Sequence, residues 1–336
     1  MKPSIHMKVL GAVLWAQPNV FADPVTFKAN LLKRAYPQVA PPPASLQLQA
    51  YIAHDQLCGH AVFRLEPQAE ATDWHILYIH GGGYVHELIA PHWAIIEQLM
   101  RATGSTVTAP IYPLAPEHTY LEAHAFMLDV YRKVLSRTPP ERVVFCGDSA
   151  GAGFCVALTQ ACQDARLPLP AHLILFSPWV DVTMPAPEIA DIAPKDPLLA
   201  RPGAVVAGEL WAGHDSPLNP AVSPTYGPLA GLPPMDLFVG TNDIVLPDVR
   251  TFAQKARTAG GQVGLHEYPE AYHVFMAAAF TPEAQDVYRK IRTILRTETY
   301  QIKLDGLTRL VSSPPVRLAA LIRDRRQGKG AANLRP

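Results

Sequence analysis

A glycine-flanked serine stands between two apolar segments near the middle of the sequence. Residues 147–151 read Gly-Asp-Ser-Ala-Gly, which places Ser149 between two glycines. The preceding residues 142–146 form a short apolar run typical of a β-strand, and residues 154–158 are small and apolar enough for a buried helix. A sharp strand-to-helix turn can project a nucleophilic serine hydroxyl from the edge of a sheet. An ordinary turn built from small residues is the alternative.

Three consecutive glycines form the second candidate site. Residues 80–84 read His-Gly-Gly-Gly-Tyr and follow the apolar run 74–79 directly. Such glycines leave backbone N–H groups unobstructed, and acyl transfer needs such donors because negative charge builds up on the carbonyl oxygen. A phosphate-binding loop would require Gly-Lys-Ser/Thr or a Gly-x-Gly-x-x-Gly pattern, and neither occurs here. Together with Ser149, the glycines therefore predict an oxyanion hole.

A serine nucleophile needs a base, and the chain contains 13 histidines. On a fold with this strand–turn–helix motif, the expected order is serine, acidic residue, histidine. His273 follows the last predicted strand, 263–268, in a loop, whereas His266 lies within that strand and points off one face. A loop position beyond the last strand lets His273 reach Ser149, so we predict that it is the base.

An acidic residue should follow the penultimate strand, 235–239. Asp243 does so, in the loop 240–243 (Gly-Thr-Asn-Asp). Asp248 is the competitor, but it begins the next predicted helix, where a capping role is a sufficient explanation. Asp236 opens the strand at the opposite end of the sheet. We therefore expect Asp243 to accept a hydrogen bond from the ring of His273.

The amino-acid composition argues against several other classes of function. The 336 residues are 49% hydrophobic and 17% charged, with zero net charge, which fits a large globular core. The chain as a whole has no basic excess that would indicate nucleic acid or an anionic membrane surface as a partner. No apolar run reaches the roughly 18 residues of a membrane span, so we expect no stable membrane insertion. His, Cys and Asp do not cluster at ligand spacing, and we therefore predict neither a metal nor a cofactor.

Two features, the four cysteines and the N-terminal residues, bear on the cellular compartment of the protein. The cysteines at 58, 146, 155 and 162 form no Cys-x-x-Cys pair, so we expect free thiols in a reducing, cytoplasmic environment. Residues 9–16 are apolar and follow Lys2 and Lys8. Such a stretch fits either the short end of secretory signal peptides or an amphipathic helix.

Strand and helix patterns alternate from residue 74 onwards. Short apolar runs predict strands, and periodic segments between them predict helices; this alternation is typical of a parallel sheet covered on both faces. An antiparallel hairpin at residues 46–52 and 58–65, connected around His54 and Asp55, brings the predicted total to about eight strands. The predicted strands are 74–79, 106–112, 142–146, 172–176, 235–239 and 263–268, and the predicted helices are 91–102, 121–135, 149–165, 203–211, 247–259 and 282–296.

The alternation defines the expected domains. Residues 46–180 and 226–300 form the α/β core, and residues 181–225 are a Pro-rich insertion. Residues 1–45, helical and broken by prolines, form with this insertion a cap over the edge of the sheet where ligands bind in open α/β folds. Residues 301–336 are a basic tail to which the pattern assigns no role.

These motifs resemble those of the hormone-sensitive-lipase-like branch of the α/β-hydrolases, which includes many bacterial carboxylesterases. The resemblance extends from about residue 23 to residue 296, and the paired glycine and serine motifs are its most specific part. It is carried by residues 80–84, 147–151, 240–243 and 272–275, and residues 112–118 and 177–179 also match.

The resemblance implies a serine esterase with an α/β-hydrolase fold and a helical cap. Ser149 would be the nucleophile, His273 the base and Asp243 its orienting acid, while the N–H groups of Gly82, Gly83 and Ala150 would form the oxyanion hole. The substrate would be a small-molecule acyl ester, and the Pro-rich cap with its tryptophans suggests short to medium acyl chains. An amidase, lactonase or deacetylase could use the same residues, and a non-catalytic receptor of this fold is a further alternative, although such receptors lack the histidine.

Overall fold

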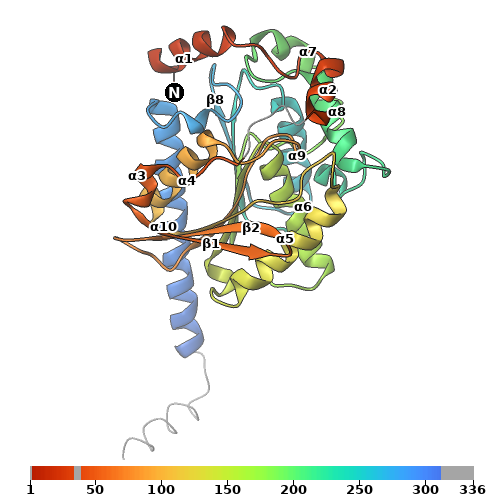
Figure 1. The fold of residues 1–336 in the computed structure, drawn as a ribbon. Coiled ribbons are helices and arrows are strands. Elements are labelled where there is room, and N and C mark those ends of the chain that lie inside the picture. Colours follow the sequence, from red (N-terminus) through yellow and green to blue (C-terminus); the bar gives the residue numbers. More distant parts are fainter. Residues whose placement is uncertain (1, 34–38, 312–336) are drawn as a thin grey trace, which may run out of the picture. The chain divides into compact units, whose positions relative to one another are not determined.

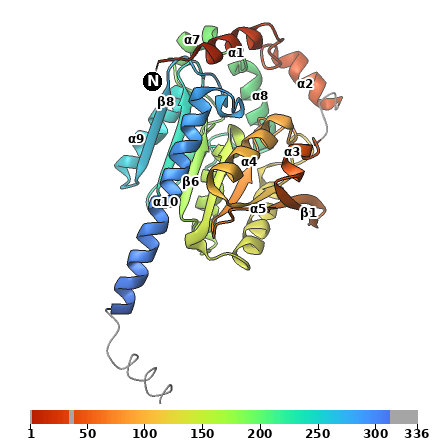
Figure 2. The ribbon, with the colours of Figure 1, turned by 90° about the vertical axis from the view of Figure 1, so that its left-hand side faces the viewer.

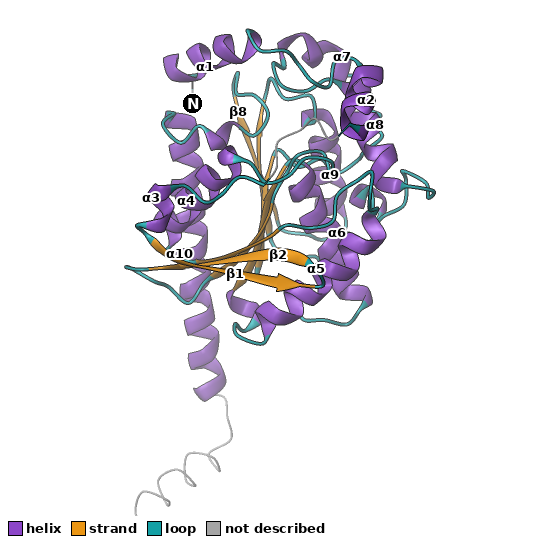
Figure 3. Cartoon of the chain, viewed as in Figure 1, coloured by secondary structure: helices purple, strands orange, loops and turns teal. Residues whose placement is uncertain are grey.

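The computed structural model describes residues 2–33 and 39–311. The chain divides into two compact units, Met1–Ile291 and Arg292–Pro336, and Figures 1, 2 and 3 show the ribbon from two sides and by secondary structure. In the first unit, strands and helices alternate along most of the chain. The strands are β1 (Ala50–Leu57), β2 (His60–Pro67), β3 (His75–Ile79), β4 (Thr106–Pro110), β5 (Val143–Asp148), β6 (His172–Phe176), β7 (Met235–Gly240) and β8 (Val263–Tyr268).

Ten α-helices and four short 3₁₀ turns lie within the described residues. The helices of the α/β core are α4 (Ala90–Thr103), α5 (Tyr120–Leu135), α6 (Ala150–Asp164), α9 (Leu246–Thr258) and the start of α10 (Pro282–Val311). The remaining helices are α1 (Ile5–Trp15), α2 (Pro24–Leu32), α3 (Ala44–Gln47), α7 (Ile189–Ile192) and α8 (Arg201–Ala212). The 3₁₀ turns are η1 (Pro140–Arg142), η2 (Ala193–Lys195), η3 (Pro224–Tyr226) and η4 (Phe275–Ala277).

One eight-stranded sheet forms the centre of the first unit, in the order β1-β2-β4-β3-β5-β6-β7-β8. Strands β3 to β8 pair in parallel, and β2 pairs antiparallel with both β1 and β4. Every residue of β3, β5 and β6 is buried, as expected for parallel strands covered on both faces. The predicted mostly parallel, eight-stranded α/β sheet is therefore confirmed.

Helices cover both faces of this sheet. In Figure 1, α4 and the first turns of α10 lie on one side of the strands, and α5, α6 and α9 lie on the other. Local sequence defines these helices well: Thr119 and Glu122 form a capping box at the start of α5, and Gly104 ends α4 in a left-handed conformation. The predicted helices 91–102, 121–135, 149–165 and 247–259 of the core, and 203–211 of the insertion, are confirmed with small shifts at their ends.

The predicted antiparallel hairpin at the sheet edge is confirmed, but its strand bounds and the position of its turn were wrong. Leu46 and Gln47 belong to the short helix α3, and β1 begins only at Ala50. The chain turns at Cys58 and Gly59, where both residues have positive φ angles of 50° and 83°, and not around residues 54 and 55. A two-residue turn with two positive φ angles matches the twist of a hairpin. Alternation of side chains alone did not reveal this turn.

The N-terminal residues and the insertion after β6 meet beyond the carboxyl ends of the parallel strands (Figures 1 and 2). Helix α2 begins as predicted, because the side chain of Asp23 accepts hydrogen bonds from two backbone N–H groups and Pro24 occupies the first helical position. Helix α2 contacts α8, and the N–H of Gly203 donates to the carbonyl oxygen of Phe21 at 2.9 Å. The two segments expected to form a cap therefore pack together.

Helix α10 is longer than predicted. It continues to Val311, so residues 301–311 of the predicted tail are helical; residues 312–336 lie outside the described part of the chain. Among the helices that the structure describes, none has both the length and the apolar composition to cross a bilayer.

Candidate active site

The chain makes a sharp turn at Ser149, between β5 and α6. Ser149 has φ 53° and ψ −122°, a left-handed conformation that a residue with a Cβ atom rarely adopts. The flanking glycines are required sterically: a Cβ at Gly151 would lie 2.0 Å from the carbonyl oxygen of Ile79, and one at Gly147 would lie 2.7 Å from that same oxygen. The predicted strand–turn–helix context of the serine is confirmed.

His273 lies between Ser149 and Asp243. Its Nε2 is 2.8 Å from Ser149 Oγ, and its Nδ1 is 3.0 Å from each carboxylate oxygen of Asp243. All three side chains are buried. Because the carboxylate can only accept at Nδ1, the neutral ring must carry its proton there, and Nε2 then accepts from the serine hydroxyl. The structure thus brings together the three residues that sequence order selected.

Charge around the imidazole favours its protonated form. Burial by itself lowers the pKa of His273, but the negative charge of Asp243 and the hydrogen bond to it outweigh burial, so the net pKa is raised. Asp196 and Asp148 add to this rise. The surrounding carboxylates therefore stabilise the imidazolium form of His273 electrostatically.

Two loops fix the position of the Asp243 carboxylate relative to the imidazole ring of His273. The N–H of Val245 donates to Asp243 Oδ1 at 3.1 Å, and the N–H of Asn242 donates to the carbonyl oxygen of Ala271 at 2.9 Å. These loops approach so closely at Gly240 that a Cβ there would lie 2.1 Å from the Ala271 oxygen. Rigid backbone contacts therefore fix the distance between the carboxylate and the ring.

The glycine run after β3 turns its backbone toward Ser149. Gly82 and Gly83 have φ angles of 102° and 63°, which favour glycine because a Cβ would be strained. Within the part of the chain that the structure describes, the N–H groups of Gly82, Gly83 and Ala150 donate no hydrogen bond to the protein. Gly82, Gly83 and Ser149 all line one cavity. Unengaged amides beside a serine hydroxyl can stabilise a developing oxyanion.

Asp148 connects this loop to the serine turn, a contact that sequence reasoning missed. Its Oδ1 accepts from the hydroxyl of Tyr78 at 2.5 Å and from the N–H of Gly81 at 3.1 Å, and its Oδ2 lies 3.5 Å from His92 Nε2. A Cβ at Gly81 would lie 2.2 Å from this carboxylate. Although burial opposes it, the contact with His92 and the hydrogen bonds lower the net pKa of Asp148.

Asp196 is a second carboxylate near His273 that the motifs did not reveal. Its Oδ1 accepts from the N–H groups of Leu198 and Leu199 at 2.8 and 2.9 Å, and its Oδ2 accepts from the N–H of Ile244 at 3.0 Å. Burial raises the pKa of Asp196 to about 6, and the charge of Asp243 adds to the rise. The Asp-Pro sequence at 196–197 is typical of a turn, but nothing local indicates a contact 48 residues away.

A large apolar cavity of about 740 Å³ opens onto Ser149 and His273. Its size is in the range of small-molecule sites. Its walls come from the core, from the N-terminal helices and from the insertion after β6. The side chains from outside the core include Leu10, Leu14, Val20, Phe21, Leu198 and Leu199.

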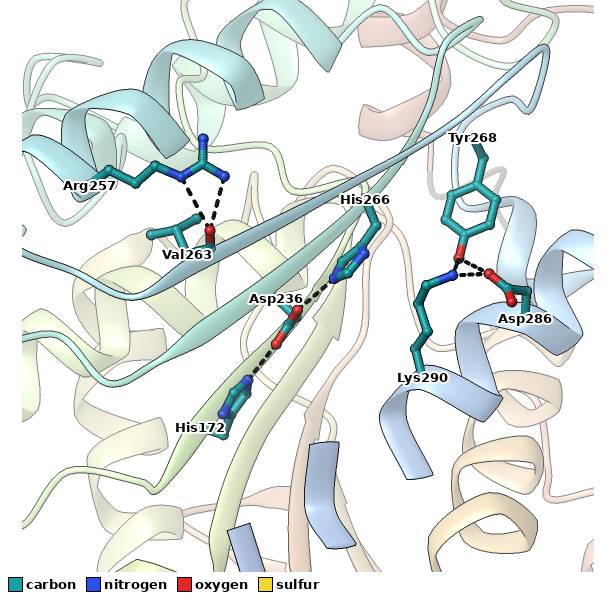
Figure 4. A network of polar contacts seen from close by, with 8 residues as sticks. All are labelled: His172, Asp236, Arg257, Val263, His266, Tyr268, Asp286 and Lys290. Carbon is teal, nitrogen blue, oxygen red and sulfur yellow. Dashed lines mark hydrogen bonds and ion pairs between the residues drawn. The ribbon is translucent and has the colours of Figure 1, made fainter. Parts of the chain in front are cut away.

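His266, the histidine rejected from the sequence, belongs to a separate cluster on the sheet (Figure 4). Its Nε2 lies 2.6 Å from Asp236 Oδ1, and His172 Nε2 lies 2.9 Å from Asp236 Oδ2, so the three side chains bridge β6, β7 and β8. Figure 4 also shows Tyr268, Asp286 and Lys290 joined between β8 and α10. Neither cluster contacts Ser149. Among the described residues, no three His, Cys, Asp or Glu side chains are arranged to hold a metal ion.

Asp248, the competing acid, lies in the first turn of α9. Burial raises its pKa to about 7, the charge of Asp181 adds to this rise, and its Oδ2 has no hydrogen-bond partner among the described residues. The folded state therefore holds this proton more tightly than the unfolded chain does, so ionisation destabilises the fold progressively between about pH 4 and pH 7.

Asp248→Asn should therefore raise the free energy of unfolding at pH 8 by ~1–3 kcal/mol, since one pKa unit corresponds to about 1.4 kcal/mol. At pH 4 the gain should be much smaller, because the carboxyl group is then protonated in the folded state and about half protonated in the unfolded chain. Urea unfolding at the two pH values measures the difference. A gain of equal size at both pH values would contradict an electrostatic origin.

Comparison with known proteins gives one consistent result. A family model described as alpha/beta hydrolase fold matches residues 76–277, more than half of the chain. An acetyl-hydrolase of Streptomyces hygroscopicus is 33% identical over 243 residues, which cover 72% of this chain and 81% of the relative. An esterase of Acinetobacter venetianus is 33% identical over 239 residues, which cover 70% of this chain and 78% of the relative.

Solved structures agree with these relatives. An esterase from the bacterial hormone-sensitive lipase family superposes with a TM-score of 0.75 at 26% identity, covering 89% of this chain and 99% of the other. A hormone-sensitive lipase from a metagenome library superposes with a TM-score of 0.74 at 29% identity, covering 89% of this chain and 98% of the other.

Proposed function

The chain belongs to the α/β-hydrolase fold family, and from this premise we propose that it is a serine carboxylesterase of the hormone-sensitive-lipase type in which Ser149, His273 and Asp243 act together. Esterases and acetyl-hydrolases among its relatives support the reaction class. The observation that carries the assignment of residues is the 2.8 Å contact between His273 Nε2 and Ser149 Oγ. That contact is what a base needs in order to activate a serine.

In this mechanism, Ser149 Oγ attacks the carbonyl carbon of the ester while His273 Nε2 takes the hydroxyl proton. The carbonyl oxygen becomes negatively charged, and the N–H groups of Gly82, Gly83 and Ala150 stabilise it. The protonated ring then gives its proton to the departing alcohol oxygen, which leaves Ser149 acylated. A water molecule, deprotonated by the same ring nitrogen, then attacks the acyl carbon. The bond between that carbon and Ser149 Oγ breaks, the ring returns its proton to Oγ, and the acid is released.

Asp243 keeps the proton of His273 on Nδ1 and stabilises the imidazolium during both halves of the reaction. No metal or organic cofactor has a role in this sequence of steps. Of the groups that act in these steps, Gly82, Gly83, Ser149 and His273 line the cavity.

Residues 1–45 and 181–225 act as the cap, and residues 46–180 and 226–300 as the catalytic core. The contact between α2 and α8 and the shared walls of the cavity support this division. Because the cap contributes apolar side chains such as Leu14 and Leu198 to the cavity, the preferred substrates are small-molecule esters with short to medium acyl chains. A cytoplasmic location is supported by the four free cysteines, of which only Cys58 is exposed.

Covalent labelling tests this assignment without a natural substrate. A fluorophosphonate should form one adduct per chain, on Ser149, because such reagents require a serine activated by a base. Turnover of p-nitrophenyl acetate, butyrate, octanoate and palmitate should then be greatest for the short and medium esters. An adduct on another residue, or an unlabelled protein that still hydrolyses these esters, would overturn the assignment.

A further inference from the structure

Helix α1 is apolar on two opposite faces. The inner face is buried or lines the cavity through Met7, Leu10 and Leu14. On the outer face, Ile5, Val9 and Val13 are spaced by four residues, and 72%, 59% and 54% of their surfaces are exposed. A helix that is apolar all round is ordinarily buried on all sides. The outer face of α1 is therefore unusual for a protein surface.

This exposed apolar surface is local. Thirteen large apolar side chains are exposed within the described residues, and seven of them fall between residues 5 and 32. Isolated exposed apolar residues are normal, but a concentration of them marks a contact surface. We call the side chains of Ile5, Val9, Val13, Trp15, Val20 and Phe280 the apolar rim.

The apolar rim is continuous with the cavity. Val20 and Phe280 line the cavity that contains Ser149, and 50% and 62% of their surfaces are also exposed to solvent. These two side chains therefore belong both to the outer surface and to the cavity wall. The rim lies where a hydrophobic substrate would enter.

Charge in the same segment is positive, although the whole chain is neutral. Residues 1–33 contain four lysines and a single acidic residue, Asp23, and the chain carries zero net charge. All four lysines, at positions 2, 8, 28 and 33, are exposed. Lys8 pairs with the exposed Glu270 at 3.7 Å, and such a pair between exposed side chains contributes little. The N-terminal segment that supplies most of the apolar rim thus combines exposed apolar side chains with exposed cationic groups.

From this combination we infer that the apolar rim docks the enzyme on an anionic lipid surface, from which an ester substrate enters the cavity. Helix α1, with 11 residues, is too short to span a bilayer and would lie in the interface, as short apolar helices with lysines do. A second copy of the chain is a poorer occupant, because a symmetric contact would bring the same lysines together. This inference rests on the proposed function for the chemistry that follows docking.

Vesicle co-sedimentation tests the docking surface. The full chain should bind phosphatidylcholine–phosphatidylglycerol vesicles more tightly than vesicles of phosphatidylcholine alone, and added salt should weaken the binding. The triple variant Ile5→Gln, Val9→Gln, Val13→Gln should bind the anionic vesicles on the order of tenfold or more weakly. A matched control, Leu48→Gln with Leu218→Gln, removes exposed apolar side chains elsewhere and should bind like the wild type.

Soluble and vesicle-borne substrates separate docking from catalysis. The triple variant should hydrolyse dissolved p-nitrophenyl acetate at the wild-type rate, because none of its changed side chains lines the cavity. It should lose activity on p-nitrophenyl octanoate carried in anionic vesicles. Ser149→Ala should bind vesicles normally without turnover; if Ser149→Ala remains active, the proposed function fails while the docking result stands.

Any one of three results would contradict the docking of the apolar rim on a lipid surface. The wild type could fail to bind anionic vesicles, the triple variant could bind them as tightly as the wild type, or light scattering could show a wild-type dimer that the triple variant converts to monomers. The last result would assign the apolar rim to contact between two copies of the chain.

Discussion

Replacing Ser149 with alanine is expected to lower kcat for p-nitrophenyl acetate by a factor on the order of 10⁶, as removal of the nucleophile does in other serine hydrolases. The expected loss is this large because the hydroxyl oxygen, 2.8 Å from His273 Nε2, forms the covalent bond to the acyl group. A water molecule in place of this hydroxyl group would be neither held in the same position nor covalently attached to the protein. Discontinuous assays and burst-phase measurements at pH 8 give kcat for the wild type and the variant.

Ser149→Gly is the matched control for folding. Both variants lack the hydroxyl, but only glycine relieves the left-handed backbone at this position, where φ is 53°. Strain of this kind costs on the order of 1–3 kcal/mol, partly offset by the greater freedom of glycine in the unfolded chain. We therefore expect the glycine variant to unfold at a higher temperature than the alanine variant, with both inactive. Activity retained by either variant would contradict the role of Ser149.

The backbone strain at Ser149 explains why this site could be predicted from the sequence. The elbow requires glycines at 147 and 151, because a Cβ at Gly151 would overlap the carbonyl oxygen of Ile79, and such requirements leave a readable motif. Parallel topology then restricts the acid and the base to loops after later strands, which selects Asp243 and His273. Local sterics and chain order together were sufficient for these residues.

Contacts between distant segments left no such motif. Asp148 accepts hydrogen bonds from Gly81 and Tyr78, and Asp196 accepts one from the N–H of Ile244. Asp148 stands within the 147–151 motif, but neither that motif nor the residues around Asp196 indicate these partners. Burial and partner geometry decide their roles, and both depend on the completed fold. The turn of the edge hairpin was misplaced for a related reason: Cys58 and Gly59 resemble many short loops in sequence.

Asp243→Asn is expected to lower kcat by a factor on the order of 10⁴ with little loss of stability. The carboxylate lies 3.0 Å from His273 Nδ1 with both oxygens, and it can only accept a hydrogen bond. An amide in its place can donate to Nδ1, which would move the ring proton to Nε2 and remove the base that Ser149 needs. The variant should still react with a fluorophosphonate, but far more slowly.

The pH profile and Asp248→Asn separate this effect from general damage. Because the charge of Asp243 raises the pKa of His273, its loss should move the acidic limb of kcat/KM to lower pH, where the neutral ring first becomes available. Asp248→Asn removes a carboxylate five residues away and should leave both kcat and the limb unchanged. If Asp248→Asn instead abolished activity while Asp243→Asn kept it, the two acids would exchange roles, and the 3.0 Å contacts of Asp243 would have to be structural. If Asp243 orients His273, then Asp243→Asn should both lower kcat and lower the pKa of the acidic limb. A contact with a structural role alone predicts neither change.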